Sequence, residues 1–351
     1  MTGTVTADKT NRLGKMLEDS RRVAVVTHTR PDGDAIGSSA AMVCSLLRDG
    51  HRDARLVIPN AMPDFLEFVT GECCPGRVVR YDLEPEKAIS WIGSCDLIIC
   101  LDASGFDRIE GIQAALEASK AHKILIDHHI RPQEEHFDLV FSETEISSTC
   151  ELLFWIMLAM EGTGDAGRLP MPVLRALLTG MTTDTNNFAN SVFPSTFEMA
   201  SMMLAAGVDR DGILQELYNR CRENRLRMMG YMLKDKLKVL PNGAAYIVVR
   251  AGELKEYDIR EGEMEGIVNM PLTLDKVRLS IFLKEDSGFF RVSLRSKRGT
   301  SAFRMAERYF HGGGHEQASG GRLYFPGDIA GPSLAEAYLE RVTDCFFESE
   351  R

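Results

Sequence analysis

The sequence of 351 residues has no long hydrophobic run and no apolar block near its start. Its longest apolar run, residues 152–160, is about half as long as a membrane-spanning helix, so it predicts a buried helix instead. The first twenty residues are polar, unlike a secretory leader. We therefore expect a soluble, cytoplasmic protein that has no membrane partner.

The sequence also has no paired-cysteine motif, although it contains eight cysteines. They are scattered, and several lie within apolar stretches, as Cys100 does in Leu97-Ile98-Ile99-Cys100. Without an export signal, reduced and buried thiols are expected. The adjacent pair Cys73 and Cys74 leaves metal binding or a redox response open as the less favoured alternative.

Positive charge is in deficit, with a formal net charge of −10, and aromatic residues make up only 8%. The charge excludes the large basic surface that would bind long duplex DNA. A processive exonuclease would need a long basic channel with stacking aromatic residues, and the sequence shows no sign of one. A small anionic substrate remains compatible with the negative net charge, because a few arginines or a metal pair can dominate the electrostatic field inside a cleft.

The length is too great for a single core and fits two domains. Short apolar strands alternate with helical stretches in the first half, which predicts a parallel sheet with helices on both faces. Strands are expected at 21–28, 55–59, 96–102 and 122–127, and helices at 35–47, 148–160 and 172–180. Ligands of such a sheet gather at the carboxyl ends of its strands.

The second half begins with a helical segment, residues 195–240, which is rich in Met, Arg and Lys and has no strand pattern. We interpret it as a connector between a first domain, 1–194, and a smaller α/β domain, 241–351, with a mixed sheet. Strands are expected there at 244–250, 277–284, 289–295 and 322–325, and helices at 302–310 and 333–347. Asp286-Ser287-Gly288 would close a hairpin. The predicted active site lies in the cleft between the domains.

The segment Thr27-His28-Thr29-Arg30-Pro31-Asp32-Gly33-Asp34 contains the strongest local signal for chemistry. Three potential metal ligands, His28, Asp32 and Asp34, fall within seven residues between a predicted strand and a predicted helix. A plain turn with an N-cap is the alternative, because Asp and Gly are common there.

Further potential ligands are Asp102 and the triplet Asp127-His128-His129 at other strand ends, and Asp184 in Thr182-Thr183-Asp184-Thr185. Adjacent imidazoles and carboxylates are costly to bury without a shared function. The set is suited to two divalent ions, and imidazole with carboxylate and no thiolate favours Mn²⁺, with Mg²⁺, Co²⁺ or Fe²⁺ as alternatives. A structural zinc site would use cysteines.

Two further motifs each allow two interpretations. Ser148-Thr149-Cys150-Glu151 matches a capping box, and phosphate contact by Ser148 or Thr149 is the less favoured alternative. Gly312, Gly313 and Gly314, followed by His315, predict backbone amides that approach a phosphate, with a tight turn as the alternative.

Arg295 and Ser296 end a predicted strand of the second domain. The guanidinium of Arg295 is suited to phosphate by its bidentate geometry.

Taken together, the motifs TRPDGDAIGS, LDAS, DHH and TTDT resemble the DHH phosphoesterase superfamily, and GGGHEQASG resembles the signature of its DHH-associated domain. They span residues 27–320 in the order typical of the family. The size resembles the NrnA type, which combines oligoribonuclease with phosphatase activity on 3′-phosphoadenosine 5′-phosphate (pAp). Asn186-Asn187 depart from the small residues expected after Asp184, which makes the pocket's preference less certain.

The resemblance implies a role for each site residue. His28 and Asp32 would hold one ion, Asp34, His128 and Asp184 the other, and Asp102 both. His129 would face the scissile phosphate, and Asp127 would orient an imidazole. Substrate binding in the second domain would use Arg295, Ser296, Gly312, Gly313, Gly314 and His315.

The expected activity is hydrolysis of short oligoribonucleotides to mononucleotides, and of pAp to AMP, by attack of a metal-activated hydroxide on phosphorus. A phosphodiesterase for cyclic di-AMP or linear dinucleotides would use the same residues and is the first alternative; a pyrophosphatase is less favoured. A non-catalytic nucleotide sensor would be expected to have lost a metal ligand, yet all six are present. The sequence leaves a monomer or a homodimer open.

Overall fold

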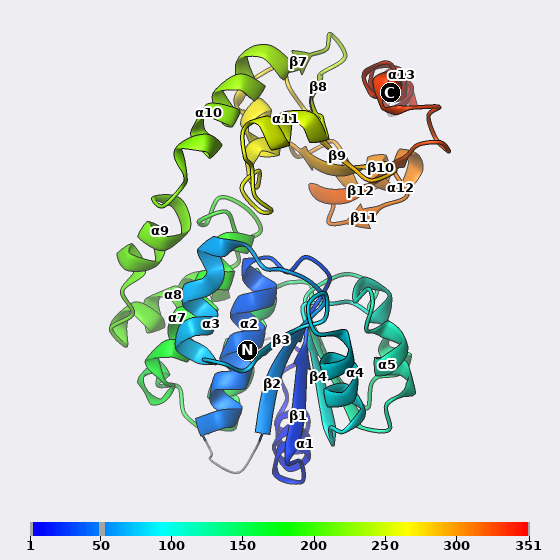
Figure 1. Cartoon of the computed structure of the whole chain (residues 1–351). Coiled ribbons are helices and arrows are strands. Elements are labelled where there is room, and N and C mark those ends of the chain that lie inside the picture. Colours follow the sequence, from blue (N-terminus) through cyan, green and yellow to red (C-terminus); the bar gives the residue numbers. More distant parts are fainter. Residues whose placement is uncertain (1–2, 49–52, 350–351) are drawn as a thin grey trace. The chain divides into compact units, whose positions relative to one another are not determined.

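The structure, a computed structural model, describes residues 3–48 and 53–349 and divides into two compact units (Figure 1). The first unit is Met1–Arg220 and the second is Cys221–Arg351. The predicted connector is shared between them, because α8 (Pro194–Ala205) and α9 (Arg210–Tyr218) belong to the first unit and α10 (Glu223–Tyr231) to the second. Within the described residues, no helix is long and apolar enough to cross a membrane.

A six-stranded sheet in the order β3-β2-β1-β4-β5-β6 forms the centre of the first unit, and every pairing in it is parallel. The strands are β1 (Arg22–Val26), β2 (Asp53–Ile58), β3 (Val78–Arg80), β4 (Leu97–Leu101), β5 (His122–Asp127) and β6 (Leu139–Ser142). The predicted parallel sheet is therefore confirmed. The unpredicted strands β3 and β6 have three and four residues, too few for a clear apolar pattern.

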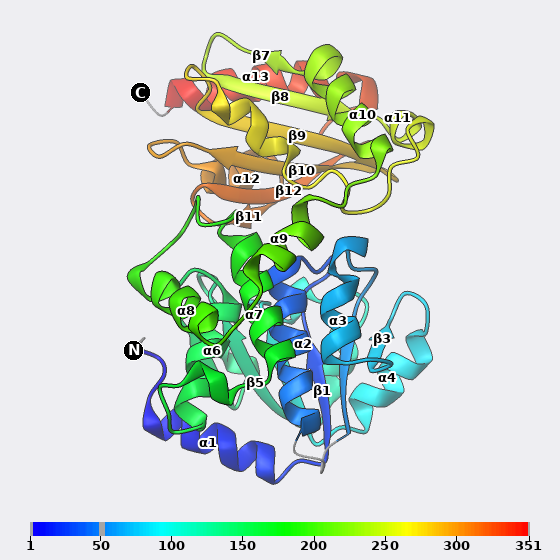
Figure 2. The ribbon, with the colours of Figure 1, turned by 90° about the vertical axis from the view of Figure 1, so that its left-hand side faces the viewer.

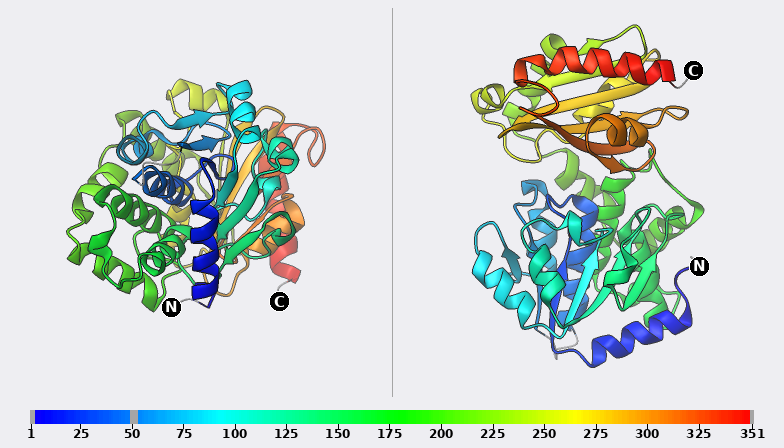
Figure 3. Two further views of the ribbon diagram at one scale, coloured as in Figure 1. Left: turned by 90° about the horizontal axis from the view of Figure 1, so that it is seen from below. Right: turned by 90° about the vertical axis from the view of Figure 1, so that its right-hand side faces the viewer.

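Helices cover both faces of this sheet, as predicted (Figures 2 and 3). Alternate residues of each strand point to opposite faces, so Val23 and Val25 join one core while Ala24 and Val26 join another. The first face packs on α2 (Gly33–Arg48), α3 (Glu67–Cys73), α6 (Thr149–Met160) and α7 (Met171–Asp184). The second face packs on α4 (Pro85–Gly93) and α5 (Gln113–Ala118).

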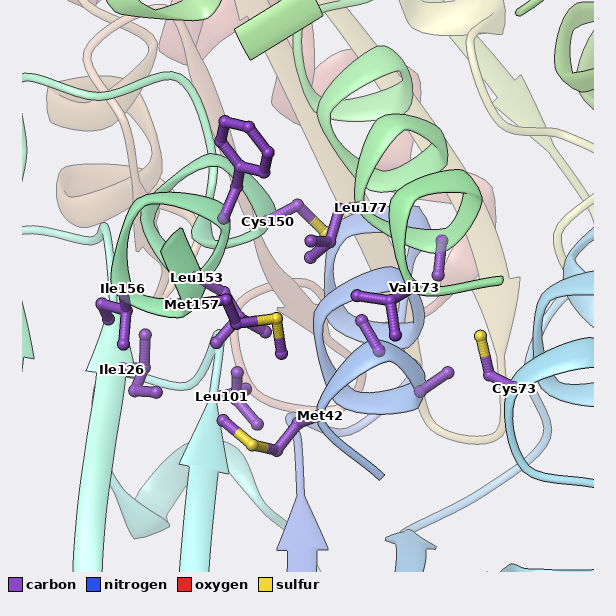
Figure 4. Close-up of a cluster of buried hydrophobic side chains, with 14 of the residues drawn as sticks. Met42, Cys73, Leu101, Ile126, Cys150, Leu153, Ile156, Met157, Val173 and Leu177 are labelled. Carbon is purple, nitrogen blue, oxygen red and sulfur yellow. The ribbon is translucent and has the colours of Figure 1, made fainter. Parts of the chain in front are cut away.

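Helices α2, α6 and α7 pack around a buried apolar cluster (Figure 4). Met42 of α2, Leu153 and Met157 of α6 and Leu177 of α7 meet Leu101 of β4 there. Each is at most 6% exposed. This core fixes the helices whose ends contribute side chains to the site described below.

Helix α1 (Ala7–Glu18) is the first helix of the described residues and was not predicted. Its sequence is polar, but Leu13 and Leu17 fall four residues apart on one buried face. The hydroxyl of Thr6 caps the helix by accepting a hydrogen bond from the amide of Lys9 at 3.3 Å.

The second unit is built on a mixed sheet in the order β11-β12-β10-β9-β8-β7, in which only β8 and β9 pair in parallel. The strands are β7 (Lys238–Val239), β8 (Ala244–Val249), β9 (Leu279–Asp286), β10 (Phe289–Ser296), β11 (Gly313–Gly314) and β12 (Ala318–Tyr324). The predicted hairpin at residues 286–288 joins β9 to β10.

Both faces of the second sheet are also covered. One packs on α12 (Ala302–Tyr309) and α13 (Ala335–Ser349), which are visible in the right-hand view of Figure 3. The other packs on α10, the π-helix at Met232–Lys236 and the 3₁₀ helix at Ile267–Thr273, with α11 (Ala251–Glu256) nearby. The predicted mixed sheet with helices is confirmed.

Candidate metal centre

The carboxyl ends of three neighbouring strands of the first sheet contribute side chains to one place. His28 follows β1 by two residues, Asp102 directly follows β4, and Asp127 is the last residue of β5 and precedes His128. Because β1, β4 and β5 are adjacent and parallel, these side chains meet at the same edge of the sheet.

The turn that follows β1 brings in two more carboxylates. Asp32 precedes α2, and its Oδ1 accepts hydrogen bonds from the amides of Asp34 and Ala35, each at 3.1 Å. The capping interpretation is therefore correct for Asp32, and the same carboxylate also reaches His28. Asp34 lies in the first turn of α2 and is 1% exposed.

A first group of potential ligands consists of His28, Asp32 and Asp102, whose ligand atoms all lie within 4.8 Å of one another. The Nε2 atom of His28 lies 3.9 Å from Asp32 Oδ1 and 3.5 Å from Asp102 Oδ2. The Nδ1 atom of His28 is engaged with the carbonyl of Thr29 at 3.0 Å. This second contact fixes the ring so that Nε2 faces the carboxylates.

A second group consists of Asp34, His128 and Asp184, again within 4.8 Å. His128 Nε2 lies 3.9 Å from Asp34 Oδ2 and 3.6 Å from Asp184 Oδ2. Asp184 is the last residue of α7, so it reaches the strand edge only because α7 lies closely against α2. Its side chain is 28% exposed, whereas those of Asp34 and His128 are at most 6% exposed.

Asp102 lies between the two groups. Its Oδ2 faces His28, while its Oδ1 lies 3.6 Å from His128 Nε2. Its backbone has φ 55°, a left-handed conformation that is uncommon outside glycine and that is found in functional sites. The two oxygens of this carboxylate thus face one imidazole from each group.

The N-terminus of α6 faces the same carboxylates. The amides of Thr149 and Cys150 donate to the two oxygens of Asp34 at 2.7 and 2.9 Å. The Thr149 hydroxyl donates to Asp102 Oδ1 at 2.9 Å. Amides at a helix start stabilise negative charge, which offsets the cost of burying Asp34.

The capping box predicted for α6 is only half correct. The Ser148 hydroxyl does accept a hydrogen bond from the Glu151 amide at 3.0 Å. The Glu151 carboxylate, however, turns to Ser147 and to the hydroxyl of Thr196 on α8. Glu151 is fully buried, so tertiary partners replace the local one that the sequence suggested.

Asp127 holds the second imidazole of the triplet. Its Oδ1 lies 2.8 Å from His129 Nδ1, and its Oδ2 accepts a hydrogen bond from the His129 amide at 3.2 Å. The rings of His128 and His129 meet edge to face, with centroids 4.7 Å apart. The two imidazoles therefore have different partners, as neighbouring residues at a strand end should.

The electrostatics of the site show an excess of negative charge. Burial would lower the pKa of His28, but hydrogen bonds to Asp102 and Asp32 raise it to about 10. Burial, together with the charges of Asp102 and Asp184, raises the pKa of Asp34 well above its ordinary value. The carboxylates thus favour a bound cation, whether a proton or a metal ion.

The residues fit a pair of divalent cations. Two imidazoles and four carboxylates form two adjoining groups, Asp102 of the first lies 3.6 Å from His128 of the second, and no thiolate belongs to either group. The excess of negative charge is what two dications would neutralise. His129 also forms a group with Asp102 and Asp127, but the hydrogen bond to Asp127 already engages its Nδ1.

The backbone conformation after Asp184 explains why Asn186 and Asn187 stand where small residues were expected. Asn186, Asn187 and Phe188 have φ of 47°, 56° and 67°, all in the left-handed region. Asparagine tolerates this conformation better than most residues. The Asn187 side chain also accepts a hydrogen bond from Arg210 at 2.6 Å.

The predicted substrate-binding residues lie in the second unit. Arg295 and Ser296 end β10; the buried Ser296 hydroxyl donates to the Thr300 carbonyl at 2.6 Å, and Arg295 Nη1 donates to the Leu294 carbonyl at 2.9 Å. The amide of His315 donates to the Ala318 carbonyl at 2.8 Å. Phosphate binding by these residues stays a prediction.

The three glycines before His315 differ in what packing requires of them. A methyl group on Gly314, which has φ 136°, would lie 2.7 Å from the Ala318 carbonyl, and one on Gly312 would collide with the Gly320 carbonyl. A tight turn therefore accounts for both. On Gly313 the nearest atom would be 3.8 Å away, so packing does not require glycine there.

Sequence reasoning missed the contribution of Thr149 to this site. The sequence predicts a helix cap at 148–151, with phosphate contact as the alternative, whereas the structure shows Thr149 bonded to Asp34 and Asp102. The signal available was its place at the start of a predicted helix, where amides and a hydroxyl can meet an anion. Which anion they meet depends on the tertiary packing of α6 against α2.

Comparison with known proteins agrees with this arrangement. Residues 22–181 match the DHH family, N-terminal domain, and residues 243–345 match the DHHA1 domain. The probable bifunctional oligoribonuclease and PAP phosphatase NrnA of Streptococcus mutans is 28% identical over 86% of this chain and 89% of that protein. The cyclic-di-AMP phosphodiesterase GdpP of Geobacillus thermodenitrificans is 25% identical, over 95% of this chain but only 49% of that protein.

A solved structure matches along the whole length. The crystal structure of an exopolyphosphatase-related protein from Bacteroides fragilis is 33% identical, covers 100% of this chain and 99% of that chain, and superposes with a TM-score of 0.88. The chain therefore belongs to the DHH family of phosphoesterases, with a C-terminal DHHA1 domain.

Proposed function

We propose that this protein hydrolyses phosphate bonds in very short nucleotides. Its substrates would be dinucleotides and other short oligoribonucleotides, cleaved to mononucleotides, and pAp, converted to AMP. The observation that carries the proposal is the position of Asp102 between two groups of potential metal ligands. The likeness to the NrnA protein of Streptococcus mutans over most of both chains supports the substrate class.

Six residues of the first unit would hold two divalent ions, with Mn²⁺ preferred. One ion would be held by His28, Asp32 and Asp102, and the other by Asp34, His128, Asp184 and Asp102. Two such ions would supply an activated water near neutral pH and would draw charge from the phosphoryl oxygens. Mixed imidazole and carboxylate ligation without thiolate supports Mn²⁺, with Mg²⁺, Co²⁺ or Fe²⁺ as alternatives.

His129 would contact the reacting phosphate. Since Asp127 engages its Nδ1, any hydrogen bond or proton that it gives to a phosphate oxygen must come from Nε2. Asp127 would keep the ring in that tautomer and orientation, as carboxylates do for imidazoles beside metal sites. Burial would lower the pKa of His129, but the hydrogen bond to Asp127 raises it, which favours a ring that donates.

The second unit would bind the part of the substrate that is distant from the reacting phosphate. Arg295 would pair with a phosphate group, because the guanidinium geometry is suited to bidentate contacts. The substrate would approach the backbone of Gly313 closely. Packing within the protein does not require glycine at this position, so a role in binding would account for it. Ser296, Gly312, Gly314 and His315 would shape the same site, with His315 adding a hydrogen bond.

A cyclic-di-AMP phosphodiesterase is the second candidate, because GdpP of Geobacillus thermodenitrificans is similar over almost the whole of this chain. This chain spans only about half of that protein, whereas it spans 89% of the NrnA protein. The difference in length favours the first candidate.

A turnover panel tests the proposal. The purified protein with Mn²⁺ would be assayed on pAp, diribonucleotides, RNA of five to ten nucleotides, cyclic di-AMP and pyrophosphate. We expect dinucleotides and pAp to be hydrolysed fastest, with rates falling as the RNA lengthens. Preference for cyclic di-AMP or for long single strands would overturn the substrate assignment, and absence of all turnover would favour a nucleotide sensor.

A further inference from the structure

Thr149 contacts two of the predicted ligands at once, with different parts of the residue. Its backbone amide donates to Asp34 Oδ2 at 2.7 Å, and its hydroxyl donates to Asp102 Oδ1 at 2.9 Å. Asp34 belongs to the second group of potential ligands, and Asp102 belongs to the first and faces His128 of the second. Thr149 is fully buried, so these contacts are shielded from competing water.

The Thr149 hydroxyl is not needed to start the helix that carries it. Ser148 caps α6 by accepting the amide hydrogen of Glu151, and the Thr149 hydroxyl acts as a donor to a side chain instead. Its backbone amide would remain after any side-chain change. The hydroxyl therefore has a separable effect, which is confined to Asp102.

That effect is to set the rotation of the Asp102 carboxylate. A carboxylate oxygen has two lone pairs, so Oδ1 can accept from Thr149 and still face His128 Nε2, which lies 3.6 Å away. With Oδ1 fixed, Oδ2 is directed to His28 at 3.5 Å. Without the hydroxyl, a buried carboxylate loses a charge-assisted hydrogen bond and the constraint on its rotation.

We infer that Thr149 is a positioning residue, which holds the carboxylates of Asp34 and Asp102 in register so that the two ion positions form together. This inference rests on the two-ion site of the proposed function. Residues that orient metal ligands typically change metal affinity by about 10–100-fold when they are mutated. We therefore expect loss of the Thr149 hydroxyl to weaken Mn²⁺ binding by a factor of that size, which can be measured independently of turnover.

The test compares Thr149→Val, which keeps the shape and removes the hydroxyl, with Thr149→Ser, which keeps the hydroxyl. Mn²⁺ binding to the full chain would be followed by calorimetry, and the spin coupling of the bound ions by electron paramagnetic resonance. We expect wild type to bind two coupled ions. Thr149→Val should bind at least one of them about 10–100-fold more weakly, with reduced coupling, and Thr149→Ser should stay within about threefold of wild type.

Thr70→Val is the matched control, because Thr70 is also buried in the first unit and its hydroxyl donates to the Glu67 carbonyl in the same helix, at 3.2 Å, away from the predicted ligands. It should leave Mn²⁺ binding unchanged. Thermal unfolding without metal identifies variants that do not fold. If Thr149→Val does not fold, Thr149→Ala takes its place.

Three outcomes separate the possibilities. Wild-type affinity and coupling in Thr149→Val would overturn the inference while leaving the two-ion site intact. Equal loss in Thr149→Ser and Thr149→Val, matched by equal loss of thermal stability, would also overturn it, because the residue would then act only on the fold. A wild-type protein that does not bind two ions would reject the two-ion site itself, and with it the proposed function.

Discussion

Gly37 on α2 lies so close to Ala176 on α7 that a methyl group at position 37 would be 2.6 Å from the Ala176 carbonyl oxygen. The same methyl would lie 3.0 Å from the Cys150 sulfur and 3.1 Å from the Gly180 amide nitrogen. Position 180 is equally restricted, since a methyl there would be 2.9 Å from the Gly33 carbonyl. Glycine thus allows the approach that brings Asp34 and Asp184 to one site.

Gly37→Ala should therefore lower the free energy of unfolding by about 1–3 kcal/mol, because overpacking outweighs the higher helix propensity of alanine. The contrasting control is Gly14→Ala in α1, where no atom lies within 4 Å of the added methyl. It should raise the free energy of unfolding by about 0.5–1 kcal/mol. Urea unfolding followed by tryptophan fluorescence reports on the first unit, which contains both Trp91 and Trp155. Equal stabilisation by both changes would contradict the close packing of α2 and α7.

Removal of metal should abolish turnover and reduce stability together. Ions that bind only the folded chain add about 2.7 kcal/mol to its stability at a concentration of 100 times the Kd. We expect the melting temperature to rise with added Mn²⁺ and to fall on chelation, with Mn²⁺ giving the highest rate on pAp. A chelated protein as active as the metal-loaded one would exclude the proposed chemistry.

Asp102→Asn should reduce kcat/KM more than a change at any other ligand, by more than about 100-fold or ~3 kcal/mol, because this carboxylate would serve both proposed ions. Asp107→Asn removes the same charge from an exposed position in the following 3₁₀ turn and should leave the rate within about twofold. Rates on pAp and metal stoichiometry would be measured for both variants. Near wild-type turnover in Asp102→Asn would remove this residue from the site.

Arg295→Ala should weaken binding of substrates that extend beyond the reacting phosphate. Loss of one charge-assisted phosphate contact costs about 1.5–3 kcal/mol, or roughly ten- to a hundredfold in kcat/KM. The effect should appear with pAp, mainly in KM, and be absent with a small artificial phosphodiester. Arg341→Ala, on α13 of the same unit, is the control for lost charge. Equal loss of kcat/KM on both substrates would mean that Arg295 supports the fold instead.

His129→Gln and Asp127→Asn should produce the same kind of defect, because the two side chains form one hydrogen-bonded unit at 2.8 Å. We expect kcat to fall by about 10–100-fold in each, with KM changed much less. The double variant should be little worse than the more impaired single one, since residues that act as a unit are not additive. Full additivity of the two losses would show that Asp127 acts independently of His129.

The local pattern of the sequence decided much of this protein. Continuous apolar runs marked β1, β4 and β5 as strands buried on both faces, and the residues at their carboxyl ends had to meet at one edge once the sheet was parallel. Ligand types at His28, Asp102 and His128 could therefore be proposed without a structure. The motifs also identified the family, because five of them occur in its typical order.

Tertiary structure alone decided which atoms come together. The Glu151 amide keeps its hydrogen bond to the Ser148 hydroxyl, but the Glu151 carboxylate accepts from Ser147 and from Thr196 on α8. Local capping rules could not predict these partners of the carboxylate. The contact of Thr149 with Asp102 joins residues 47 positions apart, and it depends on the angle at which α6 meets the sheet. Such contacts depend on side-chain packing between distant segments, and short-range periodicity contains no information about that packing.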